Sequence, residues 1–251
     1  MKQQYVINYL VQKTLKPKTK KLILFNFIFI SLSLAQNNCH PDINSEKNNY
    51  IIGYGSLMQK SSREKTTPEI KSIYPITIAG YQRIWGVADK KNGISYLAIT
   101  KNKNSKLNAA YYKVSPQQIL KTDDRELFYC REKINSRNIN SLSAKSLDNG
   151  DYWAYVIPKS KIILPSSENP LVQSYVDIFL DGCFQIEYES NITGFAQDCY
   201  TTTVEWPEKT TNNAYWINDR EAPKRPAQIL HYKEIDQLLS SQTTNNIKKQ
   251  P

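Results

Sequence analysis

Two short stretches of this chain carry residue types that can do chemistry. In the first, Tyr50-Ile-Ile-Gly-Tyr-Gly-Ser-Leu-Met58, an apolar run leads into a turn flanked by glycines. Glycine adopts conformations that other residues resist, so such a turn can bring backbone N–H groups close to a ligand. The second, Asp123-Asp-Arg-Glu-Leu-Phe-Tyr-Cys-Arg131, places one carboxylate, Glu126, between Arg125 and Tyr129. Together they predict proton transfer by a carboxylate to a ligand held by the turn.

The residues argue against the other common catalytic classes. The only histidines are His40 and His231, and a nucleophilic triad needs a folded, central histidine, which leaves only His231 open for that role. Ser56 is not in a nucleophile elbow, because that motif needs glycine two residues on each side and position 58 is methionine. The turn lacks the lysine of a phosphate-binding loop and the third glycine of a dinucleotide-binding loop. With no metal-ligand spacing in the chain, we expect carboxylate chemistry without a metal or cofactor.

The order and spacing of the two stretches resemble the gamma-glutamylcyclotransferase superfamily (AIG2-like and ChaC-type proteins). In the chain, Glu126 follows the turn by about seventy residues, with four expected strands between them. The resemblance covers roughly residues 50–185 and implies an α+β fold, a small mixed β-barrel with short flanking helices. Leu57 after the Tyr-Gly-Ser turn is nearer the glutathione-type form of the motif than the Tyr-Gly-Ser-Asn form.

The resemblance implies a reaction in which the substrate attacks itself. The α-amine of a gamma-glutamyl compound closes on the γ-carbonyl, which yields 5-oxoproline and a free amine or peptide. By resemblance Glu126 is the general acid/base. The residues that the resemblance places around the glutamyl group are Tyr54, Gly55, Ser56, Leu57, Tyr129 and Tyr155. Two alternatives remain open: a non-catalytic module that binds a glutamyl-like ligand or a partner protein, and another acyl-transfer enzyme on the same barrel.

Other charged residues near these stretches are expected to be structural. Arg125 and Arg131 are assigned as partners of Asp123 or Asp124. Asp177 is placed on the polar side of its helix as part of the scaffold.

The sequence beyond residue 185 departs from the shortest members of the superfamily. We expect an extra C-terminal element there that can wall the pocket. Its candidates for selecting the amine side of the substrate are Trp216, Asp219 and Arg220.

The elements that must position these residues follow from local patterns. Short apolar runs separated by polar turns predict strands at 50–53, 75–79, 83–87, 95–100, 107–114 and 152–157. A helix should start after Ser115, which is a capping serine followed by proline. A second, amphipathic helix is expected over 170–180, ended by Gly182. Strands mixed with a few helices indicate an α+β domain.

The N-terminus is typical of an export signal. A basic segment over 16–21 precedes an apolar segment over 22–34, and the small residues Ser33 and Ala35 allow cleavage before Gln36. We expect a signal peptide at 1–35, a flexible lead-in at 36–49, one domain at 50–239 and a disordered tail at 240–251. The mature protein is then periplasmic or secreted with no stable membrane span, unless the leader is kept as an anchor.

The charge of the chain does not indicate a nucleic-acid partner. The formal net charge is +10, but the first 35 residues hold six lysines and no acidic residue, so the remainder carries +10 − 6 = +4. A net charge of +4 does not indicate a strongly basic surface for binding DNA or RNA. The partner expected is a small gamma-glutamyl compound.

Four cysteines fall in the predicted mature chain, at Cys39, Cys130, Cys183 and Cys199. An oxidising compartment would permit one or two disulfides. The preferred pair is Cys183 with Cys199, because sixteen residues of expected turn separate them. For Cys130 a small buried hydrophobic residue beside the site is an equal alternative.

Overall fold

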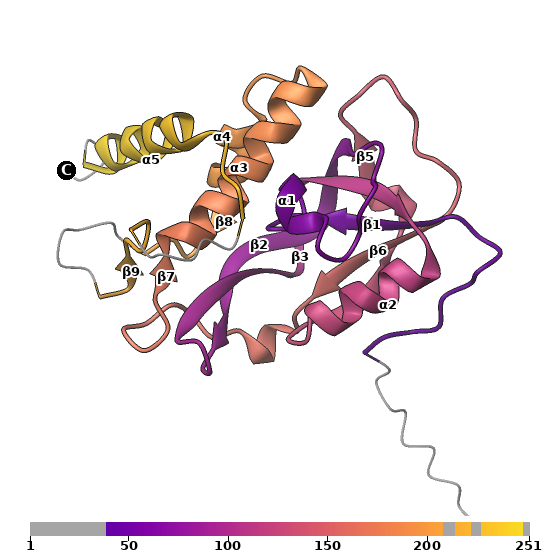
Figure 1. Ribbon diagram of the computed structural model, residues 1–251, viewed down its shortest axis with the longest axis horizontal. Helices are drawn as coiled ribbons and strands as arrows, with labels where there is room; N and C mark the ends of the chain where they lie inside the picture. The colour runs from indigo at the N-terminus through magenta and orange to yellow at the C-terminus, as the bar shows by residue number, and fades with distance from the viewer. Residues whose placement is uncertain (1–38, 208–213, 222–226, 248–251) are drawn as a thin grey trace, which may run out of the picture. The chain divides into compact units, whose positions relative to one another are not determined.

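The structure, a computed structural model, describes residues 39–207, 214–221 and 227–247, with side chains described as far as Ser241 (Figure 1). The expected signal peptide at 1–35 lies outside the described residues. Residues 38–251 group into one compact unit, apart from residues 1–37. This unit combines one large sheet with several helices, so the predicted α+β class is confirmed.

Strands and helices alternate irregularly along the chain, with most of the strands before α3. The strands are β1 (Asn49–Gly53), β2 (Tyr74–Asp89), β3 (Ile94–Val114), β4 (Cys130–Ile134), β5 (Ile139–Ser141), β6 (Asp151–Val156), β7 (Leu171–Val172), β8 (Thr203–Val204) and β9 (Trp216–Ile217). The α-helices are α1 (Lys60–Arg63), α2 (Pro116–Arg125), α3 (Gln173–Ser190), α4 (Phe195–Thr201) and α5 (Tyr232–Ile247). Two 3₁₀ turns cover Ser136–Asn138 and Lys159–Lys161.

The large sheet is mixed and open. Its strand order is β4-β6-β1-β3-β2-β5, with β8 beside β2. The central strand β1 is antiparallel to β3 and parallel to β6. The long strand β3 also reaches β6, through Ile99 and Val156. Within the described residues β4 and β5 do not pair with each other, so the predicted barrel is not closed; these edge strands are short and offer little ladder for closure.

The strands β2 and β3 are longer than the local patterns predict. In β2, Gly80 has a φ of 83° and sits at a shift of register, so the expected strands on either side of it are one bent strand. In β3, the register passes from Ala79 opposite Lys106 to Tyr81 opposite Lys101. The Lys/Asn-rich run that predicts a turn is therefore a bulge within a single strand.

Two of the three longer helices differ from their predicted limits. Helix α2 begins as expected, because the Ser115 side chain accepts from the Gln118 N–H and Gln118 accepts from the Ser115 N–H. Helix α3 passes through Gly182 and ends at Asn191, which has a left-handed φ of 52°. Helix α5 runs to Ile247, so it includes residues 240–247, which composition places in a disordered tail.

Gly182 is needed for packing rather than for ending a helix. A Cβ at this position would lie 2.6 Å from the backbone N of Gln59 and 3.0 Å from the carbonyl carbon of Met58. Only glycine lets α3 approach the segment that follows β1 so closely. The contact places α3 directly against the turn that the sequence marks as functional.

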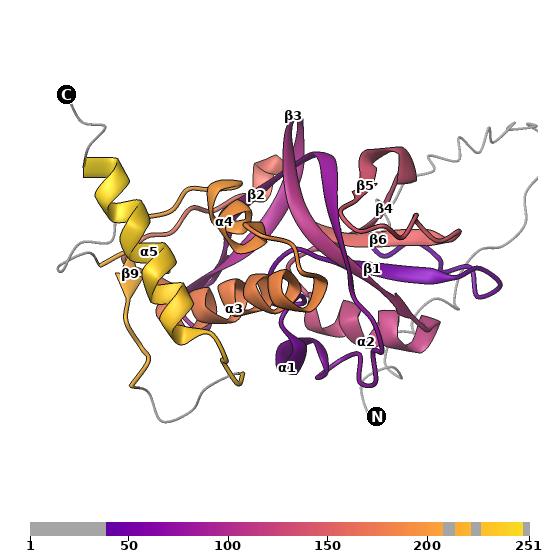
Figure 2. The ribbon, with the colours of Figure 1, turned by 90° about the horizontal axis from the view of Figure 1, so that it is seen from above.

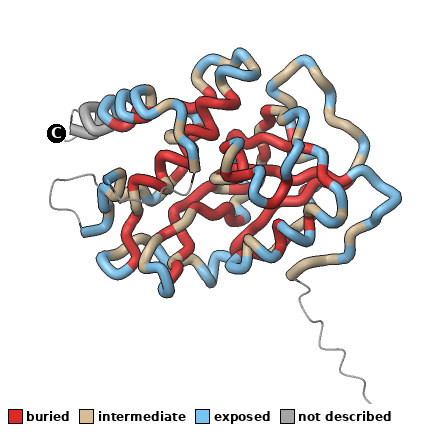
Figure 3. The backbone as a smooth tube through the Cα atoms, viewed as in Figure 1, coloured by how far each residue is buried: buried red, intermediate tan, exposed pale blue. Residues whose placement is uncertain are grey.

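The hydrophobic core forms three clusters around the sheet. One lies inside the curl of the strands and includes Ile52, Ile99 and Tyr111; another lies under α2 around Ile119. The third packs α3 between the sheet and α5, with Phe179 at its centre (Figure 2). The burial colours of Figure 3 show the same arrangement, with the sheet and α3 buried and much of α5 exposed. The scaffold around the turn is therefore well packed on both faces of the sheet.

Candidate active site

The site lies where three neighbouring strands meet at one edge of the sheet. Because β1 and β6 are parallel, both end there, and β4, antiparallel to β6, begins there. The turn 54–58 leaves the end of β1, and Glu126 and Tyr129 lie in the link between α2 and β4. Two stretches about seventy residues apart in sequence are thus brought together by strand pairing.

The turn after β1 is tight and positions backbone donors. A Cβ on Gly53 would lie 3.1 Å from Leu57, which is a tight contact, so this glycine suits the close approach of the chain to itself. Neither Gly53 nor Gly55 has a left-handed φ, so the expected need for special glycine conformations is not the reason for the motif. The Met58 N–H donates to the Gly55 carbonyl at 3.0 Å. Among the described residues, no protein group accepts from the Ser56 N–H.

The seven residues that the resemblance assigns to the site line one pocket, which holds about 20 Å³ of free space, room for about one water molecule. They are Tyr54, Gly55, Ser56, Leu57, Glu126, Tyr129 and Tyr155. The pocket is completed by Leu97 of β3 and Tyr175 of α3, which the sequence patterns did not mark. Their proximity is shown by the structure, while their roles in catalysis stay predictions.

Glu126 is a carboxylate under two opposing influences. It lies just past the end of α2 and its N–H donates to the Thr122 carbonyl at 2.9 Å. Burial raises the pKa of the Glu126 carboxyl, and the Arg125 guanidinium, with Nε 3.3 Å from Glu126 Oε1, acts in the lowering direction. A carboxyl with a raised pKa is suited to taking and returning a proton near neutral pH.

Arg125 belongs to the site, which corrects its assignment as a partner of Asp123 or Asp124. Its Nη2 donates to Ser56 Oγ at 3.1 Å, and its Nη1 donates to the Ser62 carbonyl at 2.7 Å. The guanidinium therefore connects the turn after β1 to the Glu126 carboxylate. An arginine next to a glutamate in sequence looks like a surface pair, and only the fold shows that the turn lies on its other side.

Arg131 is the partner of Asp123, as predicted. Arg131 Nε donates to Asp123 Oδ1 at 3.0 Å, and the Tyr155 hydroxyl donates to the same oxygen at 2.7 Å. The Tyr155 residue lines the pocket, and its hydroxyl is bonded to this buried pair rather than free to donate to a ligand. His40 Nε2 lies 4.0 Å from the same oxygen of Asp123.

The remaining tyrosines of the pocket keep their hydroxyls neutral. Burial raises the pKa values of Tyr54, Tyr129 and Tyr175. The Tyr54 hydroxyl donates to the Tyr155 carbonyl and the Tyr129 hydroxyl to the Leu97 carbonyl, each at 2.6 Å. Each of these oxygens still has lone pairs with which to accept a hydrogen bond from a ligand.

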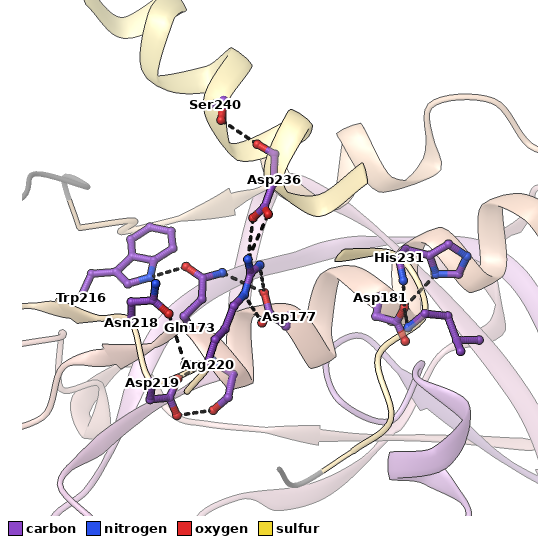
Figure 4. A network of polar contacts seen from close by, with 12 residues as sticks. Gln173, Asp177, Asp181, Trp216, Asn218, Asp219, Arg220, His231, Asp236 and Ser240 are labelled. Atoms are coloured by element: carbon purple, nitrogen blue, oxygen red, sulfur yellow. Dashed lines mark hydrogen bonds and ion pairs between the residues drawn. The ribbon is translucent and has the colours of Figure 1, made fainter. Parts of the chain in front are cut away.

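The C-terminal residues proposed to select the amine side do not line the pocket. Figure 4 shows them against the first turns of α3. Asp219 accepts from the Ser174 N–H at 2.7 Å, and Trp216 Nε1 donates to the Gln173 amide oxygen at 3.0 Å. Arg220 binds the carboxylate of Asp177, further along α3. These residues thus hold the start of α3, the part of the helix that carries Tyr175 into the pocket.

Asp177 is fully buried rather than on a polar helix face, which corrects its placement. Arg220 reaches both of its oxygens, with Nη2 2.6 Å from Oδ1 and Nε 2.8 Å from Oδ2, and Arg220 Nη1 lies 2.8 Å from Asp236 Oδ1 on α5. His231 is similarly structural: its Nδ1 lies 2.8 Å from Asp181 Oδ1. Both pairs fasten the C-terminal segment to α3 (Figure 4).

The lead-in before β1 is fastened next to the site. Cys39 forms a disulfide with Cys130, and Cys183 forms one with Cys199 as preferred from sequence. Arg131 donates its N–H to the Cys39 carbonyl and its Nη2 to the Pro41 carbonyl, each at 2.8 Å. The described part of the expected flexible lead-in is therefore bonded to β4, and Cys130 is bonded rather than a free hydrophobic residue.

The described residues contain neither a metal-binding cluster nor a membrane-spanning helix. No group of three or more His, Cys, Asp or Glu side chains in this part of the chain has an arrangement that could hold a metal ion. None of the described helices combines the length and apolar character needed to cross a bilayer.

Comparison with known proteins identifies structures similar to this chain. No family model and no curated protein matches the chain. Its structure is similar to a gamma-glutamyl cyclotransferase (10% identity, TM-score 0.47, 78% of this chain and 99% of that one). It is also similar to YkqA from Bacillus subtilis, with 14% identity and a TM-score of 0.46 over 61% of this chain and 53% of that one. A third similar structure is a yeast gamma-glutamyl cyclotransferase specific to glutathione, with 10% identity and a TM-score of 0.36 over 62% of this chain and 97% of that one. The structures found thus include the superfamily that the two motifs resemble, at identities and TM-scores that assign no activity.

Proposed function

We propose that this protein is a gamma-glutamylcyclotransferase that releases 5-oxoproline from a gamma-glutamyl peptide or amine, with glutathione among the candidate substrates. The observation that carries the proposal is the position of Glu126. It is the one carboxylate among the described residues lining the pocket, and residues 55–57 of the turn line the same pocket. Its raised pKa supports a role in proton transfer.

The reaction that this geometry supports is an intramolecular acyl transfer. The substrate α-ammonium gives a proton to Glu126, and its nitrogen then attacks the γ-carbonyl carbon. The new C–N bond closes the five-membered ring, and the C–N bond to the leaving amine breaks. The ring nitrogen gives up two protons in all and the leaving nitrogen takes up two, so Glu126 ends as it began and no water is consumed.

The other pocket residues have distinct tasks in this proposal. The N–H groups of the turn, including that of Ser56, would donate hydrogen bonds to the oxyanion that develops on the γ-carbonyl. A close-fitting pocket holds the amine and the carbonyl in attack geometry, and this positioning provides much of the rate acceleration. Arg125 favours the ionised form of Glu126 and donates a hydrogen bond to the Ser56 hydroxyl.

Export of the protein is part of the proposal. The segment 1–35 has the pattern of a signal peptide, and its removal leaves a mature chain that begins at Gln36. The two disulfides support this, because disulfides form and persist mainly in oxidising compartments. A periplasmic or secreted enzyme is expected.

The test is release of 5-oxoproline by the purified protein from glutathione and a set of gamma-glutamyl dipeptides and amines. Glu126→Gln should lower turnover by about 10²–10⁴-fold, because the amide cannot exchange the proton. Binding of substrate to Glu126→Gln, measured by calorimetry, should be kept. The matched control is Glu46→Gln, which changes an exposed glutamate in the lead-in and should leave turnover unaltered.

Two outcomes would contradict the proposal in different ways. Turnover that survives Glu126→Gln would exclude this residue as the acid/base. A folded wild-type protein that binds gamma-glutamyl compounds but releases no 5-oxoproline from any of them would instead favour the non-catalytic binding module.

A further inference from the structure

The pocket at Glu126 is the inner end of a larger groove. This groove has a volume of about 850 Å³ and shares four residues with the pocket, namely Ser56, Glu126, Tyr129 and Tyr175. Because the inner pocket has room for about one water molecule, a gamma-glutamyl ligand whose γ-carbonyl meets the turn must extend into the groove with its remaining atoms.

Aromatic rings line the groove from the pocket outward. The Tyr175 and Tyr96 rings are 4.9 Å apart, and the Tyr96 and Phe128 rings are 6.4 Å apart. At the outer end the exposed fractions are 47% for Phe128 and 76% for Leu127, although both are large apolar residues. Exposed apolar side chains gathered at the mouth of a pocket mark a ligand-binding surface.

The charges of the groove disfavour a cationic occupant. Its acidic residues within the described chain are Glu126 and Asp89. The cationic side chains that line it are Lys65, Lys90, Lys91 and Arg125, so positive charges outnumber negative ones among the described lining residues. An amine that carries a second positive charge would therefore meet a net positive charge.

The direction of the groove assigns it to the leaving amine. In the proposed cyclisation, Glu126 serves both the α-amine and the leaving nitrogen, and the glutamyl part folds back on itself to close the five-membered ring. The leaving amine is therefore the end of the substrate that is free to extend along the groove, which begins at Glu126. On the basis of that proposed function, we infer that the groove selects gamma-glutamyl compounds whose leaving amine carries an apolar, preferably aromatic, side chain. Such substrates are used in preference to glutathione, whose leaving dipeptide is cysteinylglycine.

The test compares kcat/KM for 5-oxoproline release from four dipeptides: gamma-glutamyl-phenylalanine, -leucine, -alanine and -lysine, with glutathione alongside. Burying an aromatic side chain should raise kcat/KM about tenfold or more over alanine, and lysine should be no better than alanine. Gamma-glutamyl-phenethylamine shows whether the carboxylate of the leaving amino acid adds to the selection. Equal values for phenylalanine and alanine, or a preference for glutathione or lysine, would overturn the inference.

Two variants locate the selection. Phe128→Ala should reduce the phenylalanine-to-alanine ratio several-fold, because it removes the outer ring of the groove. Leu120→Ala is the matched control: Leu120 is an exposed apolar residue of α2 that does not line the groove, and the ratio should be unaltered. If the phenylalanine-to-alanine ratio of kcat/KM is unchanged in Phe128→Ala, neither this residue nor the outer groove selects the substrate.

The inference can fail separately from the proposed function. If no dipeptide is turned over, calorimetry on Glu126→Gln still compares the binding of gamma-glutamyl-phenylalanine and gamma-glutamyl-alanine. Tighter binding of the phenylalanine compound, by about tenfold, would support the groove without cyclisation. Equal binding would contradict the groove, whatever the outcome for the reaction.

Discussion

At the residue scale, the protonation of Glu126 is decided by the groups that face it. Arg125 comes from the same helix, Tyr54 from the turn, Tyr175 from α3 and Tyr129 from the link to β4. The tyrosines are neutral because burial raises their pKa values, so Arg125 is the fixed charge nearest to the carboxylate. Burial favours the protonated acid and Arg125 favours the ionised base.

We predict that Arg125→Gln raises the pKa of Glu126 and moves the acid limb of the pH profile of kcat/KM to higher pH. The sign follows from charge: without the cation, the buried carboxylate holds its proton to higher pH and is a base over a narrower range. Turnover should therefore fall more at pH 6 than at pH 8. Arg125→Lys, which keeps the charge, should move the limb less, and superimposable limbs for all three proteins would contradict the prediction.

At the scale of elements, the sequence predicts those parts of the site whose structure depends on neighbouring residues. The turn after β1 and the start of α2 follow from glycine, serine and proline at defined positions, and both were predicted correctly. Tyr175 could not be predicted, because the start of α3 is held by Asp219, which lies 45 residues further along the chain. Gly182 was misread as a helix end, because sequence does not show that another segment needs the space of its side chain.

We predict that Gly182→Ala destabilises the protein although alanine is the better helix former. The new methyl group would lie 2.6 Å from the Gln59 backbone N, and overpacking of this kind costs about 1–3 kcal/mol, against a gain in helix propensity of about 1 kcal/mol. Urea unfolding should show the loss, and 5-oxoproline release should fall because the displaced segment follows directly on the turn. Lys121→Ala on the exposed side of α2 is the control and should stay within about 0.5 kcal/mol. A stabilised Gly182→Ala would show that α3 can move away from the turn at little cost.

At the scale of the whole molecule, two disulfides fasten the described domain, one of them at its N-terminal end. The bond between Cys39 and Cys130 spans 91 residues, and the bond between Cys183 and Cys199 spans 16. Closing a longer loop removes more freedom from the unfolded chain, so the first bond should contribute more through the unfolded state. Composition alone made the lead-in look flexible, because it does not reveal which cysteine is the partner of Cys39.

We predict that the double variant Cys39→Ser/Cys130→Ser loses about 2–4 kcal/mol of unfolding free energy in urea. Reduction of the wild-type protein should shift its unfolding midpoint in the same direction. The single variants leave one free thiol, so the double variant is the one to measure. An unchanged midpoint would mean that the hydrogen bonds from Arg131 hold the lead-in without the cystine.

Because the cystine Cys39–Cys130 closes a covalent ring, a break in the backbone inside that ring does not divide the molecule. The ring contains the turn 54–58, Glu126 and all of β3. The most exposed part of β3 is the lysine-rich bulge around residues 101–106, a natural target for trypsin-like proteases. A molecule cut there keeps the turn and Glu126 on the same covalent particle and separates into two fragments only after reduction. In a protease-rich environment the protein would then stay covalently intact after a nick in the strand that contributes Leu97 to its pocket.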